Sequence, residues 1–459
     1  MAKNAGKSKL YLGVDVGGTK ILAALVEESG RVLVRERAAT PRRGTHREVL
    51  AAIRKAMEGV LRKEKVSPRD LTAIGIAIPG VVDPDKGRVV VTPNMNLSGI
   101  AMVPALQAKF GVPVALGNDV NLGTLGEHWL GAARRAESAF GIFVGTGIGG
   151  GLVRKGEVWR GYRESAAEIG HIIMEMNGPK CGCGNRGCLE ALASRTAIER
   201  DIRKAVKAGE KTALTDLLDG DLRVIRSGAL RRALDKRDRL VTRILRRAGE
   251  VLGYACLTVR HLADPEVIVL GGGVVEACGD FLVPIARAIV EADRLPGSRP
   301  GGRVVRSALG DDAVMLGAVA LARQHVGRNP FSAHFVVPPK YAPIRGGRAG
   351  KMTVAGTSYD HDIYIRADGK VKDRAHRPCD KAGSACHKVG LKELEKVCKG
   401  GPEVLFVGTG RADRVAVVKE GLGFLQSEAI ALEVLPTPRA IRAYNQSRQR
   451  RAILLHVTC

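Results

Sequence analysis

Three cysteines and one histidine have the spacing of a metal site. Cys181, Cys183 and Cys188 are separated by two and five residues, and His171 lies ten residues before the first of them. Structural zinc sites take four sulfur and nitrogen ligands at the corners of a tetrahedron. We therefore expect one structural zinc ion (Zn2+) bound by His171, Cys181, Cys183 and Cys188. The alternatives are a disulfide or unligated buried thiols.

Two acidic residues flank this segment. Glu168 precedes His171 by three residues, so the two side chains share a face if they lie on a helical turn. Glu190 follows Cys188 by two residues. A zinc ion bound to His171 and Cys188 would therefore fix both carboxylates relative to each other. Because a four-ligand site has no open position, we expect the chemical step to take place elsewhere.

Asp119 is the candidate residue for that step. It follows Asn118 and the apolar stretch 112–116. A carboxylate at the end of a strand, facing a cleft, can accept the proton of a hydroxyl nucleophile. Phosphoryl transfer requires this of a protein residue, whereas most of the remaining catalysis is positioning and charge neutralisation. The alternative is that Asp119 caps the helix that follows.

Three glycine-rich turns follow apolar, strand-like segments, at residues 17–20, 145–151 and 271–273. Because glycine has no side chain, backbone N–H groups in such turns can approach phosphate oxygens closely. A tight structural turn is the alternative for each of them alone. Because all three turns follow strand-like segments, phosphate binding is a better explanation for the three together than a structural turn in each case. The Walker pattern GxxxxGK[ST] follows none of the expected strands.

The elements expected around these residues indicate an α/β protein. A strand at 9–16 and two further strands form an antiparallel meander with a glycine turn at its first bend. A helix near 47–63 then precedes a buried strand at 71–80. A basic helical region covers about 194–262, and we interpret its Lys and Arg side chains as a solvated helix face.

The proline-rich segment 326–343 is expected to be a linker between two domains. Beyond it, strands near 351–356 and 361–366 and a helix near 390–399 indicate a separate small α/β domain at 344–459.

Composition limits the partners. The chain of 459 residues carries 73 Lys and Arg against 47 Asp and Glu, a formal net charge of +26. A basic surface suits anionic substrates such as nucleotides. Aromatic residues make up only 4%, which leaves few stacking platforms, so we do not expect nucleic-acid binding. No uncharged apolar run approaches the roughly 18 residues of a membrane span, and the N-terminus lacks a signal-peptide core, so we expect a cytoplasmic protein.

The motifs between residues 9 and 325 resemble those of the ROK family of sugar kinases and repressors. The resemblance rests, in chain order, on Asp15–Lys20, Gly117–Asn121, Gly145–Gly151, Glu168–His171 and the CxCGxxGCxE segment at 181–190. It implies the actin-like (ribonuclease H-like) sugar kinase fold within residues 1–325. Two α/β lobes, at about 1–117 and 118–325, would enclose a sugar cleft, and the last helix would return to the first lobe.

The resemblance also implies a role for each matched residue. Asp119 is similar to the general base that acts on the sugar 6-hydroxyl. The residues that bind the hexose would be Gly80, Asn94, Asn118, Asp119, Glu168, His171 and Glu190. The residues that bind ATP phosphates and Mg2+ would be Asp15, Gly17, Gly18, Thr19 and Lys20, the second phosphate loop Thr146 and Gly147, and the nucleotide-side loop Gly271, Gly272 and Gly273.

One loop departs from the family pattern. Family members often have a Pro–Asn motif followed by a tryptophan in the loop that contacts the sugar. Residues 92–99 contain Asn94 and Asn96 and no tryptophan. We assign the sugar contact to Asn94, with Asn96 as the alternative, and the departure leaves the identity of the hexose open.

ROK proteins are enzymes or DNA-binding repressors, so two function classes compete. Repressors carry an N-terminal helix-turn-helix domain, for which the about eight residues before the first strand are too few. Asp119 also favours catalysis. We predict an ATP-dependent glucokinase that forms a homodimer or tetramer. The alternatives are an N-acetylmannosamine or other hexose kinase, polyphosphate as the donor, and a sugar-responsive regulator.

Residues 344–459 resemble a different family, a small uncharacterised α/β domain also found in a mitochondrial complex I assembly factor. The resemblance rests on Val407–Gly410 and the tail His456–Cys459. It implies no chemistry, and we interpret the domain as a protein-interaction module with an unknown partner. Gly408–Gly410 could hold an anion, with a structural turn as the alternative. The spacing of four further residues loosely resembles that of metal ligands: Cys379, Cys386, His387 and Cys398. The alternative is that these thiols bind no metal.

Overall fold

The computed structural model describes residues 9–41, 43–92, 95–295, 302–331, 341–346, 351–374, 388–410, 415–428, 430–447 and 449–456. The chain forms two compact units, residues 1–331 and 332–459. Each unit has its own sheets and its own hydrophobic cores, so each is described by itself. Within the described ranges, no helix has both the length and the apolar character needed to cross a membrane.

The first unit begins with a five-stranded sheet in the order β3-β2-β1-β4-β7. Its antiparallel meander consists of β1 (Leu10–Val16), β2 (Lys20–Glu27) and β3 (Val32–Ala39). The parallel strands that extend it are β4 (Leu71–Ile78) and β7 (Val114–Asn118). The connecting elements are α1 (His46–Lys63), the 3-10 helix η1 (Pro68–Asp70), the hairpin of β5 (Val81–Asp83) and β6 (Arg88–Val91), and α2 (Met102–Phe110).

A second five-stranded sheet repeats this pairing pattern in the order β10-β9-β8-β11-β12. Its strands are β8 (Ser138–Val144), β9 (Ile148–Arg154), β10 (Glu157–Val158), β11 (Val267–Gly271) and β12 (Arg303–Arg306). Here too the first three strands are antiparallel and the last two are added in parallel. The β1–β2 turn and the β8–β9 turn therefore occupy equivalent positions in two lobes of one topology.

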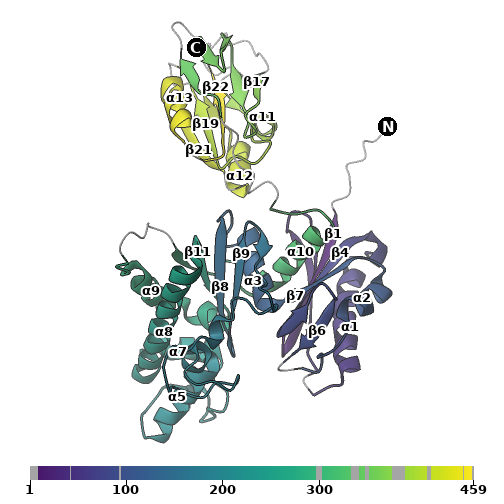
Figure 1. The fold of residues 1–459 in the computed structure, drawn as a ribbon, viewed down its shortest axis with the longest axis vertical. Helices are drawn as coiled ribbons and strands as arrows, with labels where there is room; N and C mark the ends of the chain where they lie inside the picture. The colour runs from purple at the N-terminus through teal and green to yellow at the C-terminus, as the bar shows by residue number, and fades with distance from the viewer. Residues whose placement is uncertain are drawn as a thin grey trace. The chain divides into compact units, whose positions relative to one another are not determined.

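Two helices cross between the lobes. Helix α3 (Asp119–Trp129) follows the first sheet and packs on β8 and β9 of the second. Helix α10 (Ala313–His325) follows the second sheet and packs on β1, β4 and β7 of the first, and it also packs on α3 (Figure 1). A Cβ atom at Gly317 would lie 1.7 Å from Leu122 O, so glycine is required where the two helices meet.

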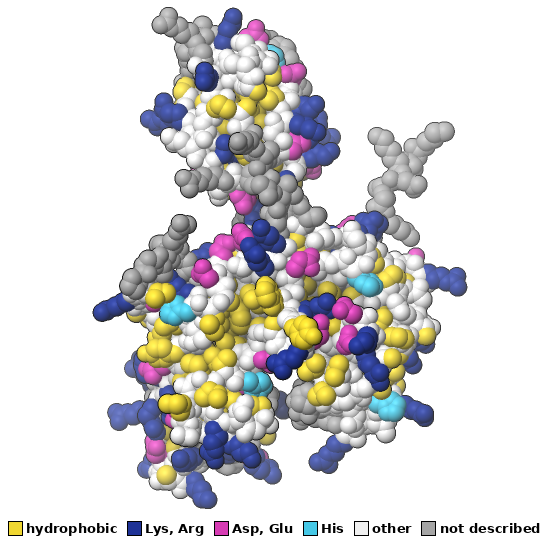
Figure 2. Space-filling view, viewed as in Figure 1, with side chains coloured by type: hydrophobic (Ala, Val, Ile, Leu, Met, Phe, Trp, Pro, Cys, Tyr) yellow, Lys and Arg dark blue, Asp and Glu magenta, His cyan; other side chains and the backbone are white. Residues whose placement is uncertain are grey.

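The remaining helices of the first unit belong to the second lobe. They are η2 (Ile169–His171), α4 (Leu189–Ala193), α5 (Arg195–Lys207), α6 (Leu214–Leu217), α7 (Ser227–Asp235), α8 (Arg239–Ala263), α9 (Gly273–Glu291) and η3 (Gly310–Asp312). Helix α8 buries Leu245, Leu252 and Val259, which recur every seven residues, and exposes Arg243 and Arg247. On the face drawn in Figure 2, Lys and Arg side chains are scattered over both units. This distribution fits a solvated basic surface.

The second unit is built on a mixed sheet in the order β17-β16-β22-β19-β21. Its strands are β16 (Ile363–Ile365), β17 (Val371–Asp373), β19 (Val404–Gly408), β21 (Ala431–Leu435) and β22 (Arg451–Leu455). Along β19, Val404 and Phe406 pack with α13 (Thr437–Gln446). Leu405 and Val407 pack on the other face, with α11 (Leu391–Val397) and α12 (Lys419–Ser427). The alternation of strand side chains thus places helices on both faces.

Smaller strands complete this unit. They are β13 (Ile344–Gly346), β14 (Met352–Val354) and β15 (Thr357–Tyr359), which form one sheet, and the pair β18 (Lys388–Val389) and β20 (Ala416–Val417). The strand expected at 351–356 is present as β14 but is shorter, because the chain turns after Val354. Ala355 and Gly356 have φ values of +50° and +85°, which a continuous strand does not allow.

Ordered structure extends into both ends of the segment expected to be a linker, 326–343. Phe331 is buried and stacks on His128, with ring centroids 5.2 Å apart. Tyr341 packs edge-on against Tyr444, with centroids 5.8 Å apart. Residues 332–340 lie outside the described part of the chain.

Candidate active site

One cavity of about 650 Å³ collects residues from both lobes. Its lining includes nine residues that the sequence analysis singled out: Gly80, Asn118, Asp119, Thr146, Gly147, Glu168, His171, Glu190 and Gly272. Pro79 and Val91 of the first lobe also line it. Asn94 lies outside the described residues, whereas Asn96 is described and donates a hydrogen bond to Gly44 O at 2.8 Å, away from this lining.

Asn118 and Asp119 stand at the junction of β7 and α3. Asn118 is the N-cap of α3, because its Oδ1 accepts hydrogen bonds from the N–H groups of Val120 and Asn121, each at 3.0 Å. Its Nδ2 donates to Gly80 O at 2.9 Å. Asn118 therefore has the capping role that was the alternative for Asp119, and the Asp119 carboxylate remains available in the cavity.

The environment of Asp119 favours a neutral carboxyl more than water does. Burial raises the pKa of Asp119 to about 6, and the negative charge of Glu168 adds to the rise. The N–H group of Val120, 2.9 Å from Asp119 Oδ1, opposes it. No cationic side chain among the described residues forms an ion pair with Asp119. A carboxylate with a pKa near neutrality can accept and release a proton.

The four expected metal ligands come together in space. The donor atoms of His171, Cys181, Cys183 and Cys188 all lie within 4.8 Å of one another. Cys183 Sγ and Cys188 Sγ are 3.7 Å apart, and Cys181 Sγ is 3.8 Å from His171 Nδ1. Donors about 2.0–2.3 Å from one ion stand about 3.3–3.8 Å apart in a tetrahedron, so this set fits zinc. All three thiols are free of disulfides.

Glu190 and Glu168 lie beside this metal-type cluster. Glu190 Oε2 accepts a hydrogen bond from Ile148 N at 3.0 Å, and Cys181 Sγ is 3.6 Å from Glu190 Oε1. Burial raises the pKa of Glu168, with His171 opposing and Glu190 adding to the rise. Both carboxylates therefore offer acceptor oxygens to a ligand in the cavity.

The two hairpin turns provide the candidate phosphate loops. At the first, Gly17 N donates to Lys20 O at 2.8 Å, and Lys20 Nζ forms an ion pair with Asp311 Oδ2 at 2.7 Å. At the second, Gly145 N donates to Gly147 O at 2.9 Å, and Arg195 Nη2 donates to Thr146 Oγ1 at 2.7 Å. The residues of the first turn, Gly17, Gly18, Thr19 and Lys20, do not line the 650 Å³ cavity, whereas Thr146 and Gly147 do.

Asp15 lies between these regions at the end of β1. Burial raises the pKa of Asp15 to about 7, and the charges of Asp119 and Asp311 add to the rise while Lys20 opposes it. The electrostatic influence of Asp119 connects Asp15 to the cavity, although Asp15 does not line it. A buried carboxylate facing other carboxylates fits the oxygen ligands that Mg2+ prefers.

The third glycine turn shapes the start of α9. Gly272 has φ of +83° and is the N-cap of this helix, and a Cβ atom there would lie 2.7 Å from Val144 N. Glycine is therefore required for both reasons. Gly272 lines the cavity, whereas Gly271 and Gly273 do not.

Sequence reasoning missed several residues that build this region. Glu127 is fully buried, and its carboxylate accepts hydrogen bonds from Ala132 N, Ser307 Oγ, Ala308 N and Leu309 N at 2.6–3.1 Å. It thereby ties α3 to the turn that leads into Asp311. Asp311 and Arg195 contact the two candidate phosphate turns from distant parts of the chain. No local motif marks these residues, because each acts through tertiary contacts.

The glycine turn of the second unit is hydrogen-bonded within that unit. The N–H groups of Thr409 and Gly410 donate to Leu435 O at 3.0 Å and to Thr437 Oγ1 at 2.9 Å. The turn Gly408–Gly410 therefore uses these donors internally, which favours a structural role. Cys398 is buried in an apolar core, and Cys379, Cys386 and His387 lie outside the described residues.

Comparisons with known proteins agree with this division. Residues 11–325 match the ROK family, and residues 344–456 match a protein family of unknown function, DUF498/DUF598. The glucokinase of Thermotoga maritima is 34% identical over 317 residues, which are 69% of this chain and 98% of that protein. The DNA-binding transcriptional dual regulator NagC of Escherichia coli is 31% identical over 313 residues, 68% of this chain and 75% of that protein.

A solved structure supports the same assignment. The ROK family glucokinase from Streptomyces griseus, in complex with glucose and AMPPNP, is 31% identical and superposes with a TM-score of 0.60, covering 69% of this chain and 99% of that one. The first unit thus has the actin-like two-lobe sugar kinase fold, and the C-terminal domain is separate from it. The matched family covers most of the chain, and the protein belongs to the ROK family.

Proposed function

We propose that this protein is an ATP-dependent kinase of the hexose 6-hydroxyl, with glucose as the first candidate substrate. One observation carries the proposal: the Asp119 carboxylate shares a cavity with Glu168, His171, Glu190 and the Thr146–Gly147 turn. Acceptors for sugar hydroxyls and a phosphate-type loop therefore lie within reach of one potential base. As the 6-oxygen attacks the γ-phosphorus of ATP, Asp119 would accept the hydroxyl proton and ADP would leave.

The acidic wall of the cavity would bind the sugar. Glu168 and Glu190 accept hydrogen bonds from hydroxyl groups, and His171 can use the ring nitrogen that is not directed at Cys181. His171, Cys181, Cys183 and Cys188 would hold zinc, which when bound would fix these side chains in place and leave the chemistry to Asp119. Gly80 and Asn118 complete the wall from the first lobe and from α3.

The glycine turns would bind the nucleotide. Backbone N–H groups of the turns 17–20 and 145–147 are the proposed phosphate ligands, and Lys20 supplies a positive charge. Asp15 would hold Mg2+, which when bound would neutralise charge on the phosphates. Because Lys20 is paired with Asp311 here, ATP would compete with Asp311 for the Lys20 ammonium group.

The relatives support a sugar kinase and leave the sugar open. Relatives of this chain include glucokinases and the NagC regulator at similar identity. Asp119, half-buried in the cavity and without an ion-pair partner among the described residues, favours catalysis, because a protein that only senses sugar has no need of a base with a raised pKa.

A coupled assay tests the proposal. Purified full-length protein would be given glucose, mannose or N-acetylmannosamine, each with ATP or with polyphosphate as the donor. We expect the highest kcat/KM for glucose with ATP. Sugar binding without turnover of any hexose would contradict the kinase and favour a regulator. A higher kcat/KM for N-acetylmannosamine would correct the substrate.

We further propose that the C-terminal domain is a protein-interaction module. The N–H groups of its glycine turn are used internally, and its buried Arg374 and His456 pair with carboxylates of the same unit. Deleting residues 340–459 should therefore leave hexose turnover unchanged and remove partners from a pull-down. Loss of turnover with an intact fold of the first unit would instead assign this domain a part in catalysis.

A further inference from the structure

The start of α5 holds the second candidate phosphate turn, residues 145–147. Arg195 N donates to Gly145 O at 3.0 Å. Thr196 donates to Thr146 O through its N–H group at 3.4 Å and through its Oγ1 at 2.8 Å. These contacts fix the backbone of the turn, and none of them uses the side chain of Arg195.

The guanidinium group of Arg195 makes a different contact, with the side chain of Thr146. Its Nη2 donates to Thr146 Oγ1 at 2.7 Å. Thr146 is exposed and lines the 650 Å³ cavity, whereas Arg195 is partly buried and does not line it. Arg195 therefore lies behind a residue of the proposed phosphate site.

This contact limits what the Thr146 hydroxyl can do. A guanidinium group only donates hydrogen bonds, so Thr146 Oγ1 accepts from Arg195 and keeps its own proton for another acceptor. No described residue accepts a hydrogen bond from Thr146 Oγ1. The oxygens of an ionised phosphate group are strong acceptors. A phosphate in the cavity would therefore supply the acceptor that the hydroxyl lacks.

The positive charge of Arg195 is compensated only in part. Its Nε is 3.2 Å from Glu199 Oε1, and the same buried carboxylate is 3.5 Å from Arg203 Nη1. The other carboxylate beside the turn, Glu190, already accepts a hydrogen bond from Ile148 N at 3.0 Å. Two guanidinium groups thus share one carboxylate at the start of α5.

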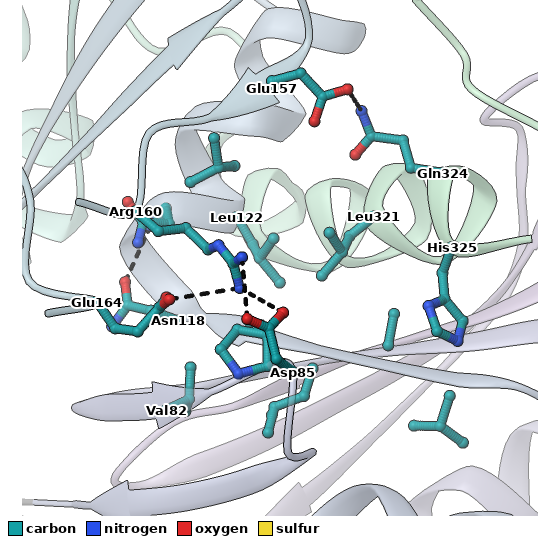
Figure 3. A pocket seen from close by; sticks show the side chains of 17 residues that line it. Val82, Asp85, Asn118, Leu122, Glu157, Arg160, Glu164, Leu321, Gln324 and His325 are labelled. Atoms are coloured by element: carbon teal, nitrogen blue, oxygen red, sulfur yellow. Dashed lines mark hydrogen bonds and ion pairs between the residues drawn. The ribbon is translucent and has the colours of Figure 1, made fainter. Parts of the chain in front are cut away.

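Arg160 of the same lobe has the opposite balance. It lies in a second cavity, of about 350 Å³, where Figure 3 shows it joined to Asp85 and Glu164. Its Nη1 is 3.1 Å from Asp85 Oδ1 and 3.5 Å from Glu164 Oε1, so two carboxylates compensate one guanidinium group. Arg195, by contrast, keeps an excess of positive charge beside Thr146, which suits an anionic ligand such as a phosphate.

We propose that Arg195 is a positioning residue for phosphoryl transfer, which holds the Thr146 hydroxyl as a donor to a phosphate oxygen of ATP. The inference rests on the proposed kinase function. It adds a side-chain donor to the backbone N–H groups of the glycine turns, and the residue that orients this donor lies 49 positions later in the chain.

A double-mutant cycle of R195M and T146V tests the proposal. At saturating glucose, R195M should lower kcat/KM for ATP by at least about tenfold, because a charge-assisted hydrogen bond is lost. In the T146V background the same change should lower it by less than about threefold, because the hydroxyl that Arg195 orients is already absent. Calorimetric titration with glucose alone should give R195M the affinity of the wild type.

R203M is the matched control, because it removes the other guanidinium group from Glu199 and does not touch Thr146. Its kcat/KM for ATP should stay within about threefold of the wild type, and thermal unfolding would confirm that each variant is folded.

Additive effects of R195M and T146V, or an equal loss in R203M, would overturn the role of Arg195 alone. A parallel loss of glucose affinity in R195M would also overturn it, because Arg195 would then only stabilise the lobe. Wild-type protein that phosphorylates no hexose would instead contradict the kinase function, and this inference with it.

Discussion

Two groups of carboxylates, one in each unit, differ in how the protein compensates their charge. In the second unit, Asp362 Oδ2 lies 2.6 Å from His456 Nδ1 and 3.2 Å from Arg374 Nη1. Arg374 also pairs with Glu393 at 2.6 Å. In the first unit, by contrast, Asp119, Glu168 and Glu190 line one cavity and form no ion pair with a described residue. Only the carboxylates of the second unit are neutralised by charged side chains of the protein itself.

We interpret the ion-paired carboxylates of the second unit as structural and the unpaired carboxylates of the cavity as functional. The network of the second unit ties the β16–β17 hairpin to α11 and to the end of β22, and it leaves little for a ligand to add. The carboxylates that line the cavity of the first unit have no cationic partner among the described residues, so a ligand or metal there would compensate their charge. Helix α3 contains both solutions, because Glu127 accepts four hydrogen bonds while Asp119, eight residues earlier, is left for the cavity.

Among the tests of this contrast, Asp119→Ala should have the largest effect. Loss of the base should lower kcat by about 10²–10⁴-fold and leave glucose binding largely intact. Calorimetric titration with glucose and the coupled kinase assay measure the two effects separately. Asp216→Ala, an exposed change on α6, is the control. Turnover retained by Asp119→Ala would refute the assignment of the base.

The second test breaks the compensated network. Arg374→Met leaves the partly buried Asp362 and Glu393 without their shared cation, although Asp362 keeps His456, and we expect a loss of about 1–3 kcal/mol in the unfolding free energy of the second unit. Denaturant unfolding followed at Tyr444 would report it. Lys372→Met, at an exposed position on β17, should change stability by less than about 0.5 kcal/mol. Equal effects of the two changes would mean that the network contributes no more than a surface charge.

Replacing one of the four expected metal ligands tests whether a metal holds the residues of the cavity in place. Cys183→Ser should lower zinc content and raise the KM for glucose by about tenfold or more, because His171 and Glu190 would lose their fixed positions. The KM for ATP should change less, since the 17–20 turn does not line this cavity. Asn185→Ser keeps all four donors in the same loop and serves as the control. Wild-type protein that contains no zinc when freshly purified would contradict the site.

The pH dependence follows from the raised pKa of Asp119. The base acts only when ionised, and its pKa is about 6, so kcat/KM should fall about tenfold per pH unit below that value. A rate profile from about pH 4.5 to about pH 8 measures it. Because the charge of Glu168 raises this pKa, Glu168→Gln should move the inflection to lower pH. A profile that is flat down to pH 4.5 would argue against Asp119 as the base.

The smallest effect concerns the loop that leads to Glu168. Ala167 has φ of +63°, a left-handed conformation that costs an alanine about 1 kcal/mol. Ala167→Gly relieves that strain and should leave stability unchanged or raise it by up to about 1 kcal/mol. Ala166→Gly, one residue earlier, lacks this compensation and should destabilise. Thermal unfolding compares the two, and a lower stability for Ala167→Gly than for Ala166→Gly would contradict the argument.

Local spacing explains which parts of the site could be predicted. The four metal-type donors, Asp119 and the glycine turns are recognisable because ligands or backbone N–H groups close together in sequence must also be close in space. Asn94 stays a prediction, since it lies outside the described residues. The alternative role expected for Asp119, the cap of α3, belongs to Asn118, and only the structure shows this.

Long-range contacts could not be predicted. The Lys20–Asp311 ion pair joins residues 291 positions apart, and Glu127 reaches Leu309 across 182 positions. No spacing rule connects such residues, because their meeting depends on α10 crossing to the first lobe.

The sequence by itself therefore determined the chemical groups: three cysteines and a histidine with the spacing of metal ligands, a candidate base and glycine turns after strands. Tertiary structure alone decided which carboxylates are compensated and which face a cavity. The physical reason is that hydrogen-bond and ion-pair partners are chosen by packing, here by two crossing helices and two repeated sheets, and packing brings together residues that the chain keeps far apart.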